Sequence, residues 1–366
     1  MRSLPLPLIR RFVPLKGLQE HSLHTLLEQC DWQLVGRGQR LFSAADVEQN
    51  QLYLLSGEAS LVYPDGVVTQ TAETLYPLGY GLAGVPLATA STDCVVLQVP
   101  KALLNRQLCW DQVASAIELE LSYQSEHDDE ASWRLTLLKS NLFQKVPPLN
   151  VGQIFSRLKP MQVKAGEVIL RQGEVGDGCY FIRRGRAAVT RRHPGESADR
   201  HIVDIGYGRC FGEDALVYET VRNATVAMSS DGLLMRLDKA DFMLLLREPV
   251  VEHIKASDLD NRLAAGAVLL DVRLPEEFDV ARLLRAQNIP LPGLRLLMEQ
   301  RELLQRECVV YCDTGSRSRA AVSLLQQAGV NARYLLNGMN GLGPDQRDRL
   351  LDVVPPLMPM PAQQYA

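Results

Sequence analysis

Two patterns of hydrophobic and polar positions divide the chain at about residue 253. Before this point, short apolar runs such as 52–55 and 180–182 are separated by glycine turns, which predicts short β-strands. After it, continuous apolar runs at 268–272 and 308–311 predict buried strands, and helices are expected from Pro275 and over 317–328. Alternating strands and helices predict a small α/β domain with a parallel sheet.

The β-rich part contains an internal repeat. Residues 38–42 match residues 166–170 at an offset of 128, and 52–59 match 180–187 at the same offset without a gap. Lys101-Ala102 then matches Lys239-Ala240 at an offset of 138, so the first copy is about ten residues shorter in this interval. A repeat of this length predicts two related β-domains, not a solenoid.

The segments outside the repeat complete the predicted organisation. Asp111 to about Leu138 has helical periodicity, and the charged run 126–130 within it is interpreted as a solvated helix face or a junction. The proline-rich end is expected to be extended. The predicted boundaries are 1–125 for the first β-domain, 139–250 for the second, 254–350 for the α/β domain and 354–366 for the tail.

Composition excludes several classes of protein. The 366 residues are 46% hydrophobic and 22% charged, with a formal net charge of −4, which disfavours a fully disordered chain and a basic nucleic-acid binder. No apolar run is long enough for a transmembrane helix, and the apolar run at the N-terminus is too short for a signal peptide. Seven cysteines without a C-x-x-C pair favour a reducing cytoplasm, and no ligand spacing suggests a metal. We therefore expect no nucleic-acid, membrane or metal partner, and a homodimer is left open.

Residues 211–226 of the second copy carry the first candidate site. Phe211-Gly212-Glu213 follows a predicted strand and can begin one helical turn whose free N–H groups hold an anion. Arg222 comes ten residues after Gly212 and can pair with a phosphate from the next strand. Glu213 could accept hydrogen bonds from a sugar hydroxyl, and this combination suits a ribose cyclic phosphate.

This segment resembles the phosphate-binding cassette of cyclic-nucleotide-binding domains, whose F-G-E-x-A-L…R-x-A-T-V pattern it meets at every fixed position. The resemblance covers about residues 140–250 and implies a β-roll fold. It implies that Glu213 binds the ribose 2′-hydroxyl, that Arg222 binds the cyclic phosphate, and that N–H groups near Gly212 and Ala215 complete the cradle. Asn223, directly after the arginine, leaves cAMP as the expected ligand and cGMP as the alternative.

The first copy departs from this cassette. Its equivalent stretch is 78–87, where no Glu follows Gly84 and no Arg occurs before Lys101. It is similar to a degenerate cyclic-nucleotide-binding fold and is expected to bind no ligand of this class. In the second copy, Glu248-Pro249 ends the helix that usually continues into a lid, so the lid is expected from another part of the protein.

The segment from Cys312 to Ser318 carries the second candidate site. Cys312 follows a buried strand and precedes a helix, where backbone N–H groups and the helix N-terminus favour a thiolate. Arg317 lies five residues later and can add positive charge. Such a loop suits nucleophilic attack on an anionic group, or its carriage.

Over about residues 254–350 the chain resembles the rhodanese (sulfurtransferase) domain, on Leu270-Asp271-Val272-Arg273, Glu277-Phe278, the C-x-x-x-x-R-S loop and 334–338. The resemblance implies that Cys312 carries sulfane sulfur as a persulfide, taken from a small anionic donor or a protein persulfide, and that Arg317 orients the donor. Asp271 and Arg273 are expected to brace the fold. The anion loop would comprise Asp313, Thr314, Gly315, Ser316 and Ser318.

Two functional hypotheses follow. In the first, a cAMP-sensing protein transfers sulfur through Cys312. In the alternative, a cAMP-binding signalling protein uses a non-catalytic rhodanese fold as an adaptor. A transcription factor is disfavoured, because an α/β domain stands where a DNA-reading domain would follow and the chain is acidic. Cys308 is expected to be a core strand residue without a redox partner.

Overall fold

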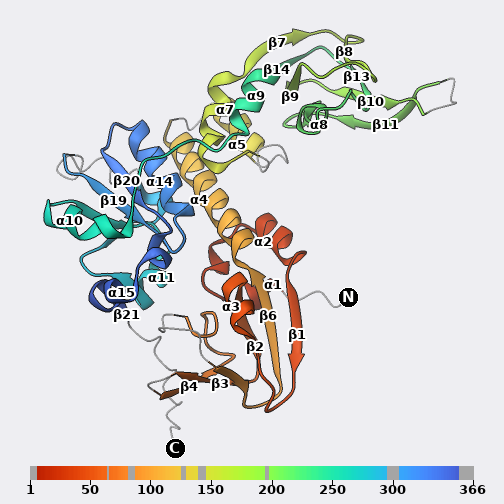
Figure 1. Cartoon of the computed structure of the whole chain (residues 1–366). Helices are drawn as coiled ribbons and strands as arrows, with labels where there is room; N and C mark the ends of the chain where they lie inside the picture. The colour runs from red at the N-terminus through yellow and green to blue at the C-terminus, as the bar shows by residue number, and fades with distance from the viewer. Residues whose placement is uncertain are drawn as a thin grey trace, which may run out of the picture. The chain divides into compact units, whose positions relative to one another are not determined.

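A computed structural model describes residues 6–63, 66–80, 87–124, 129–138, 146–193, 198–294 and 305–353 (Figure 1). These residues fall into two compact units. One comprises residues 1–112 together with 251–366, and the other comprises 113–250. Among the described helices, none is both long and apolar enough to cross a membrane.

The N-terminal part of the first unit is built from two antiparallel three-stranded sheets. Their strand orders are β1 (Asp31–Val35)-β6 (Cys94–Pro100)-β2 (Asn50–Ser56) and β4 (Gly66–Thr71)-β3 (Glu58–Tyr63)-β5 (Leu87–Ala90). One hydrophobic cluster joins inward positions of both sheets, and a second packs residues of β2 and β6 against the helices. The helices are α1 (Leu6–Ile9), η1 (Leu15–Gly17), α2 (Glu20–Leu27), α3 (Ala44–Gln49) and the first part of α4 (Lys101–Gln124), whose residues from 113 onward belong to the second unit.

The second unit contains two antiparallel four-stranded sheets around one core cluster. Their orders are β11 (Arg200–Ile205)-β10 (Ala187–Arg191)-β13 (Thr225–Met228)-β8 (Val168–Leu170) and β12 (Cys210–Phe211)-β9 (Gly178–Arg184)-β14 (Gly232–Asp238)-β7 (Lys159–Val163). The short helices are α5 (Asp129–Leu138), η2 (Pro148–Asn150), α7 (Val151–Arg157), α8 (Glu213–Val217) and α9 (Lys239–Leu245).

The strand orders repeat between the two parts. The order β1-β6-β2 corresponds to β7-β14-β9, and β4-β3-β5 corresponds to β11-β10-β13. Even the isolated bridge between Arg40 and Thr89 matches the pairing of Val168 with Ala227, at the two sequence offsets of 128 and 138. The prediction of two β-rolls is therefore confirmed. Most of the first copy's counterpart of the cassette, residues 81–86, lies outside the described residues.

The C-terminal part of the first unit is the predicted α/β domain. Its five-stranded sheet is parallel throughout, in the order β15 (His253–Ile254)-β20 (Ala332–Leu335)-β19 (Cys308–Tyr311)-β16 (Val268–Asp271)-β18 (Gln287–Asn288). A small antiparallel pair joins β17 (Ala281–Leu283) to β21 (Leu351–Val353). The helices are η3 (Ala256–Asp258), α10 (Leu259–Ala264), α11 (Pro275–Val280), η4 (Leu291–Gly293), α14 (Ser316–Gln327), η5 (Gly338–Gly341) and α15 (Pro344–Leu350).

The helical region between the copies differs from its prediction. The helix expected from Asp111 begins at Lys101, because Leu104 and Leu108 extend the buried face by ten residues, and a separate helix α5 follows. Residues 126–128 of the charged run and the whole predicted tail, 354–366, lie outside the described residues. The predicted boundaries at 125, 139, 250 and 254 stay predictions.

Candidate functional site

The cassette in the second β-roll begins at a glycine that the backbone requires. Gly212 has φ +88°, in the left-handed region, and it caps α8, which starts at Glu213. A Cβ atom placed there would lie 2.9 Å from Nη1 of Arg222 and 3.0 Å from Cδ1 of Leu170. Glycine therefore permits both the turn and the close approach of the arginine.

Arg222 is buried and directed at this turn. It is 3% exposed, and its Nη1 donates to the carbonyl oxygen of Gly212 at 2.6 Å. Nη2 donates to the carbonyl oxygen of Gly178 at 2.7 Å and to Oδ1 of Asp177 at 3.0 Å. Asp177 also pairs with Arg236 at 2.9 Å. A buried guanidinium is thus held beside the first turn of α8, and the exposed carboxylate of Asp177 balances part of its positive charge.

The other predicted cassette residues surround the same turn. Ala215 is buried in α8, whereas Glu213 is half-buried, with Oε2 3.7 Å from the sulfur of Cys210. Asn223 is exposed directly after the buried arginine. The structure thus brings Gly212, Glu213, Ala215 and Arg222 together, with Asn223 at the surface beside them.

The second candidate site lies where β19 ends. Cys312 follows this central strand and is 1% exposed. The N–H of Gly315 donates to its sulfur at 3.1 Å, and Oγ of Ser318 lies 3.6 Å from the same atom. Gly315 adopts φ +92° and caps the twelve-residue helix α14. The sulfur therefore lies at a helix N-terminus and accepts a backbone hydrogen bond.

The remaining residues of the predicted anion loop form hydrogen bonds with one another near this sulfur. Oγ of Ser318 also donates to the carbonyl oxygen of Gly315 at 3.1 Å, and Ser318 is fully buried. The hydroxyls of Thr314 and Ser316 are 3.3 Å apart. Asp313 is the acidic member, with 18% of its side chain exposed. The predicted loop residues thus lie in the connection after β19 and in the first turn of α14, which begins at Ser316.

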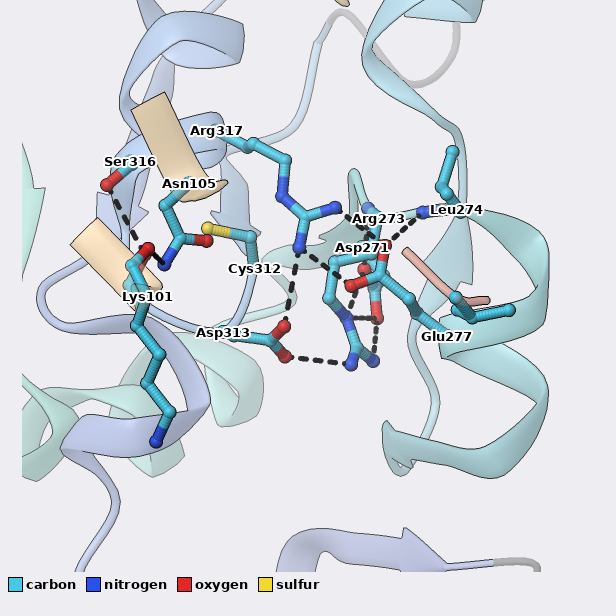
Figure 2. Close-up of polar contacts among 12 residues, drawn as sticks. Lys101, Asn105, Asp271, Arg273, Leu274, Glu277, Cys312, Asp313, Ser316 and Arg317 are labelled. Atoms are coloured by element: carbon cyan, nitrogen blue, oxygen red, sulfur yellow. Dashed lines mark hydrogen bonds and ion pairs between the residues drawn. The ribbon is translucent and has the colours of Figure 1, made fainter. Parts of the chain in front are cut away.

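Arg317 is engaged by carboxylates (Figure 2). Its Nη1 and Nη2 donate to the two carboxylate oxygens of Glu277 at 2.6 and 2.8 Å, and both side chains are 1% exposed. Nη2 also lies 3.3 Å from Oδ2 of Asp313. Both terminal nitrogens are therefore engaged, and the remaining Nε is buried without a hydrogen-bond partner among the described residues. The geometry supports a role in positioning the loop, and the predicted role in orienting a donor stays a prediction.

A second arginine joins the same charged cluster. Arg273 is fully buried and donates to both carboxylate oxygens of Asp271, at distances of 2.7 to 3.1 Å, and to Oδ1 of Asp313 at 2.9 Å. The interpretation of Asp271 and Arg273 as bracing residues agrees with these contacts. The cluster thus holds two guanidinium groups against the carboxyl groups of Asp271, Glu277 and Asp313.

The two carboxyl groups that contact Arg317 differ in pKa. Burial raises the pKa of Glu277, but the adjacent Arg317 outweighs it, and the pKa falls below its ordinary value. Burial also raises the pKa of Asp313, and the neighbouring Glu277 adds to this against the two arginines. Glu277 is therefore the carboxylate that the fold holds charged.

Comparison with known proteins identifies both parts. A family model described as the cyclic nucleotide-binding domain matches residues 160–248, and one described as the rhodanese-like domain matches 255–343. The Cyclic AMP receptor protein of Thermus thermophilus is 30% identical over 163 residues, which are 43% of this chain and 75% of the receptor. The chain belongs to the cyclic nucleotide-binding family. It also contains a rhodanese-like domain.

Two further relatives match the cyclic nucleotide-binding part over a smaller share of their length. A cyclic nucleotide-gated potassium channel of Rhizobium etli is 38% identical over 190 residues, 48% of this chain and 51% of the channel. A cAMP-dependent protein kinase regulatory subunit of Schizosaccharomyces pombe is 34% identical over 123 residues, 32% of this chain and 34% of the subunit. The chain thus spans about half of the channel and a third of the subunit.

Neither family match includes the first repeat copy. Its description as a degenerate cyclic nucleotide-binding domain therefore rests on the repeated strand order and stays a prediction. Within the described residues, no group of three or more His, Cys, Asp or Glu side chains is arranged to hold a metal ion. Cys308 is 1% exposed on β19, which confirms its interpretation as a core strand residue.

Sequence reasoning missed the carboxylates that hold the two functional arginines. Asp177 lies 45 residues before Arg222, and Glu277 lies 40 residues before Arg317. The rhodanese-like pattern includes Glu277 but indicates no partner for it. A periodicity of polar and apolar positions contains no information about such distant pairs, so only the fold could reveal them.

Proposed function

We propose that this protein senses a cyclic nucleotide, cAMP, through its second β-roll and transfers sulfane sulfur through Cys312 of its rhodanese-like domain. The observation that carries the second part is the hydrogen bond from the N–H of Gly315 to the sulfur of Cys312 at 3.1 Å, at the N-terminus of α14. A helix N-terminus and a backbone N–H group there would stabilise the negative charge of a persulfide carried on this sulfur. The seven cysteines without a C-x-x-C pair support a cytoplasmic location.

Sulfur transfer in this loop needs two displacement steps. The Cys312 thiolate attacks the outer sulfur of thiosulfate, a new S–S bond forms, and sulfite leaves with the electron pair of the broken bond. Cyanide or another thiolate then attacks the terminal sulfur of the persulfide, and the Cys312 thiolate departs. Cys312 is the catalytic residue in this scheme, while Arg317 positions the loop. The donor class is a small anionic sulfur compound or a protein persulfide.

The nucleotide part rests on the cassette geometry. A phosphate at the first turn of α8 would find the buried Arg222 already directed at Gly212, and a helix start leaves its first N–H groups without helical partners. Glu213 would accept a hydrogen bond from the ribose 2′-hydroxyl. Two of the relatives above are named for cAMP, which supports cAMP. A matching cGMP-dependent protein kinase of Caenorhabditis elegans keeps cGMP as the alternative.

Calorimetric titration with cAMP tests the nucleotide part. Arg222→Lys keeps the charge but loses the forked geometry, and a loss of about 30-fold in affinity is expected, or about 2 kcal/mol. Arg236→Lys is the matched control, because Arg236 also pairs with Asp177 but is one-third exposed, and its affinity should stay near wild type. Equal affinities for the wild type and Arg222→Lys would remove Arg222 from the site.

The sulfur part is tested by thiosulfate-to-cyanide transfer, measured with and without saturating cAMP. Cys312→Ser should abolish the activity, because a serine cannot form a persulfide. Cys308→Ala, on the strand just before, should retain it. A Cys312→Ser protein with full activity would disprove the assignment. A change in rate with cAMP would establish coupling between the two parts.

One observation favours the adaptor function as a second candidate. Both terminal nitrogens of Arg317 are occupied by Glu277, and Cys312 is 1% exposed, so the loop offers neither a free guanidinium nor an open thiol. If the rhodanese-like domain is such an adaptor, the protein would bind cAMP tightly and show no sulfur transfer with any donor. The same two assays therefore distinguish the candidates.

A further inference from the structure

The loop of Cys312 and the neighbouring segment 273–276 are contacted from outside the rhodanese-like domain. These contacts come from parts of residues 6–112, which belong to the same compact unit. We call these parts the cover. They are η1, the segment from Tyr76 to Tyr80, and the first three turns of α4.

Residues 274–276 contact η1 and Tyr76. Nζ of Lys16 forms an ion pair with Oε1 of Glu276 at 2.5 Å, beside the Glu277 that holds Arg317. Gly17 lies so close to Leu274 that a Cβ atom there would be 2.8 Å from its Cδ1. The hydroxyl of Tyr76 donates to the carbonyl oxygen of Glu276 at 3.2 Å. Three separate contacts therefore converge on 274–276.

Arg273 and Ser316 contact Tyr80 and α4, respectively. The hydroxyl of Tyr80 lies 3.5 Å from Nη1 of Arg273, the nitrogen that also binds Asp313, and its ring stacks on Tyr76 with centroids 5.6 Å apart. On α4, the thiol of Cys109 lies 3.7 Å from the carbonyl oxygen of Ser316. Asn105 is one turn earlier on the same face of the helix, and Figure 2 shows it among the residues around Cys312.

These contacts conflict with the chemistry proposed for the loop. Attack on a sulfur donor requires the donor's outer sulfur to touch the cysteine sulfur, with room for the leaving group in line behind it. A thiol that is 1% exposed cannot meet these needs. We propose that this cover inhibits the sulfur-transfer loop, and that it must withdraw before a donor reaches Cys312.

The composition of the cover is consistent with reversible withdrawal. The ion pair between Lys16 and Glu276 is exposed by 41% and 36% at its two ends, and exposed ion pairs contribute little to stability. The contacts of Tyr76 and Tyr80 involve single hydroxyl groups. Such a contact set keeps a site closed on average, but a modest change in free energy opens it. This inference rests on the proposed sulfur transfer and adds its regulation.

The test measures how fast iodoacetamide alkylates Cys312, read from tandem mass spectra of the tryptic peptide 307–317. The cover variant carries Lys16→Glu and Tyr76→Phe, which places like charges together at Glu276 and removes one hydroxyl. The matched control carries Lys164→Glu and Tyr63→Phe. Lys164 pairs with Asp231 in an exposed ion pair at 2.9 Å, and the Tyr63 hydroxyl has no hydrogen-bond partner among the described residues.

The cover variant should alkylate Cys312 about tenfold faster than the wild type, whereas the control should stay within about twofold. Equal rates in all three proteins would overturn the cover. If the double variant does not fold, judged by its melting temperature, Tyr76→Phe alone is measured against Tyr63→Phe and interpreted in the same way.

Sulfur transfer by the same proteins separates the two proposals. Faster alkylation without any transfer would support the cover and contradict the sulfurtransferase. Transfer at one common rate, with unchanged alkylation, would support the sulfurtransferase and contradict the cover. Faster alkylation together with faster transfer would support both.

Discussion

Replacing Glu277 by glutamine should weaken the rhodanese-like domain selectively. Glu277 accepts two charge-assisted hydrogen bonds from Arg317, at 2.6 and 2.8 Å, and both side chains are 1% exposed. The glutamine keeps the shape and can accept one of these bonds, but its NH₂ group then faces a guanidinium N–H, and two donors cannot pair. Arg317 would stay buried with only Asp313, at 3.3 Å, to balance its charge.

The expected cost follows from this geometry. One lost hydrogen bond to a charged group is worth about 1.5–3 kcal/mol, and breaking a buried pair by removing one partner costs about 3–5 kcal/mol. Because Asp313 and the retained bond compensate in part, we expect about 3 kcal/mol. Glu252→Gln is the control, since Glu252 pairs with Arg333 at 3.0 Å but is 63% exposed, and the expected cost is about 0–1 kcal/mol.

Hydrogen exchange followed by mass spectrometry is the suitable assay. A chain of several domains does not unfold in two states, and none of its three tryptophans lies in the rhodanese-like domain, so tryptophan fluorescence would report other parts. The free energy of opening of β16 and β19 should fall by about 3 kcal/mol in Glu277→Gln, while that of β9 and β14 should not change. A fall of less than about 1 kcal/mol in β16 and β19 would refute the importance given to this buried pair.

Three further predictions concern the same two sites. Gly212→Ala should lower the free energy of unfolding by about 1–3 kcal/mol and weaken cAMP binding, because a left-handed φ disfavours alanine and its methyl group would meet Arg222. Thermal melting and calorimetric titration measure the two effects, and values near wild type would contradict this geometry. Asn223→Thr should raise the affinity for cGMP relative to cAMP in a competition assay, if the exposed residue after Arg222 contacts the base, and an unchanged ratio would exclude that contact. The stability difference between the wild type and Glu277→Gln should be full above about pH 5 and shrink as the pH falls below 4.5. The pKa of Glu277 is below its ordinary value of 4.5, so its contribution exists above that value and is lost on protonation. A pH-independent difference would argue against a charged Glu277.

The chemical composition of both sites could be predicted from the sequence because each is local. The cassette spans Gly212 to Asn223, and the sulfur loop spans Cys312 to Ser318, so the order of residues alone places a turn, a short helix and the functional side chains near one another. The repeat offsets of 128 and 138 likewise anticipated the shared strand order, down to the bridge between Arg40 and Thr89.

The helix α4 could be predicted only in part. The periodic pattern predicts a helix from Asp111, but the helix begins at Lys101. It follows directly on the strand β6, which ends at Pro100. Its first three turns combine core positions with the face that contacts the loop of Cys312. Packing against a separate domain creates apolar positions that do not follow a single amphipathic stripe, and periodicity therefore underestimates such a helix.

The element types, the repeat and the two short motifs can be recognised in the order of residues, because hydrophobic period and turn residues act over a few positions. Which charged side chains meet is set by the packing of the folded chain. Arg317 pairs with Glu277, Arg222 pairs with Asp177, and Tyr80 contacts Arg273 from a distance of 193 residues along the chain. These contacts depend on how sheets and helices pack, and the energy of a buried charge depends on all its neighbours in space. For that reason the burial of Cys312, and the contacts that residues 6–112 make around its loop, could be found only in the folded chain.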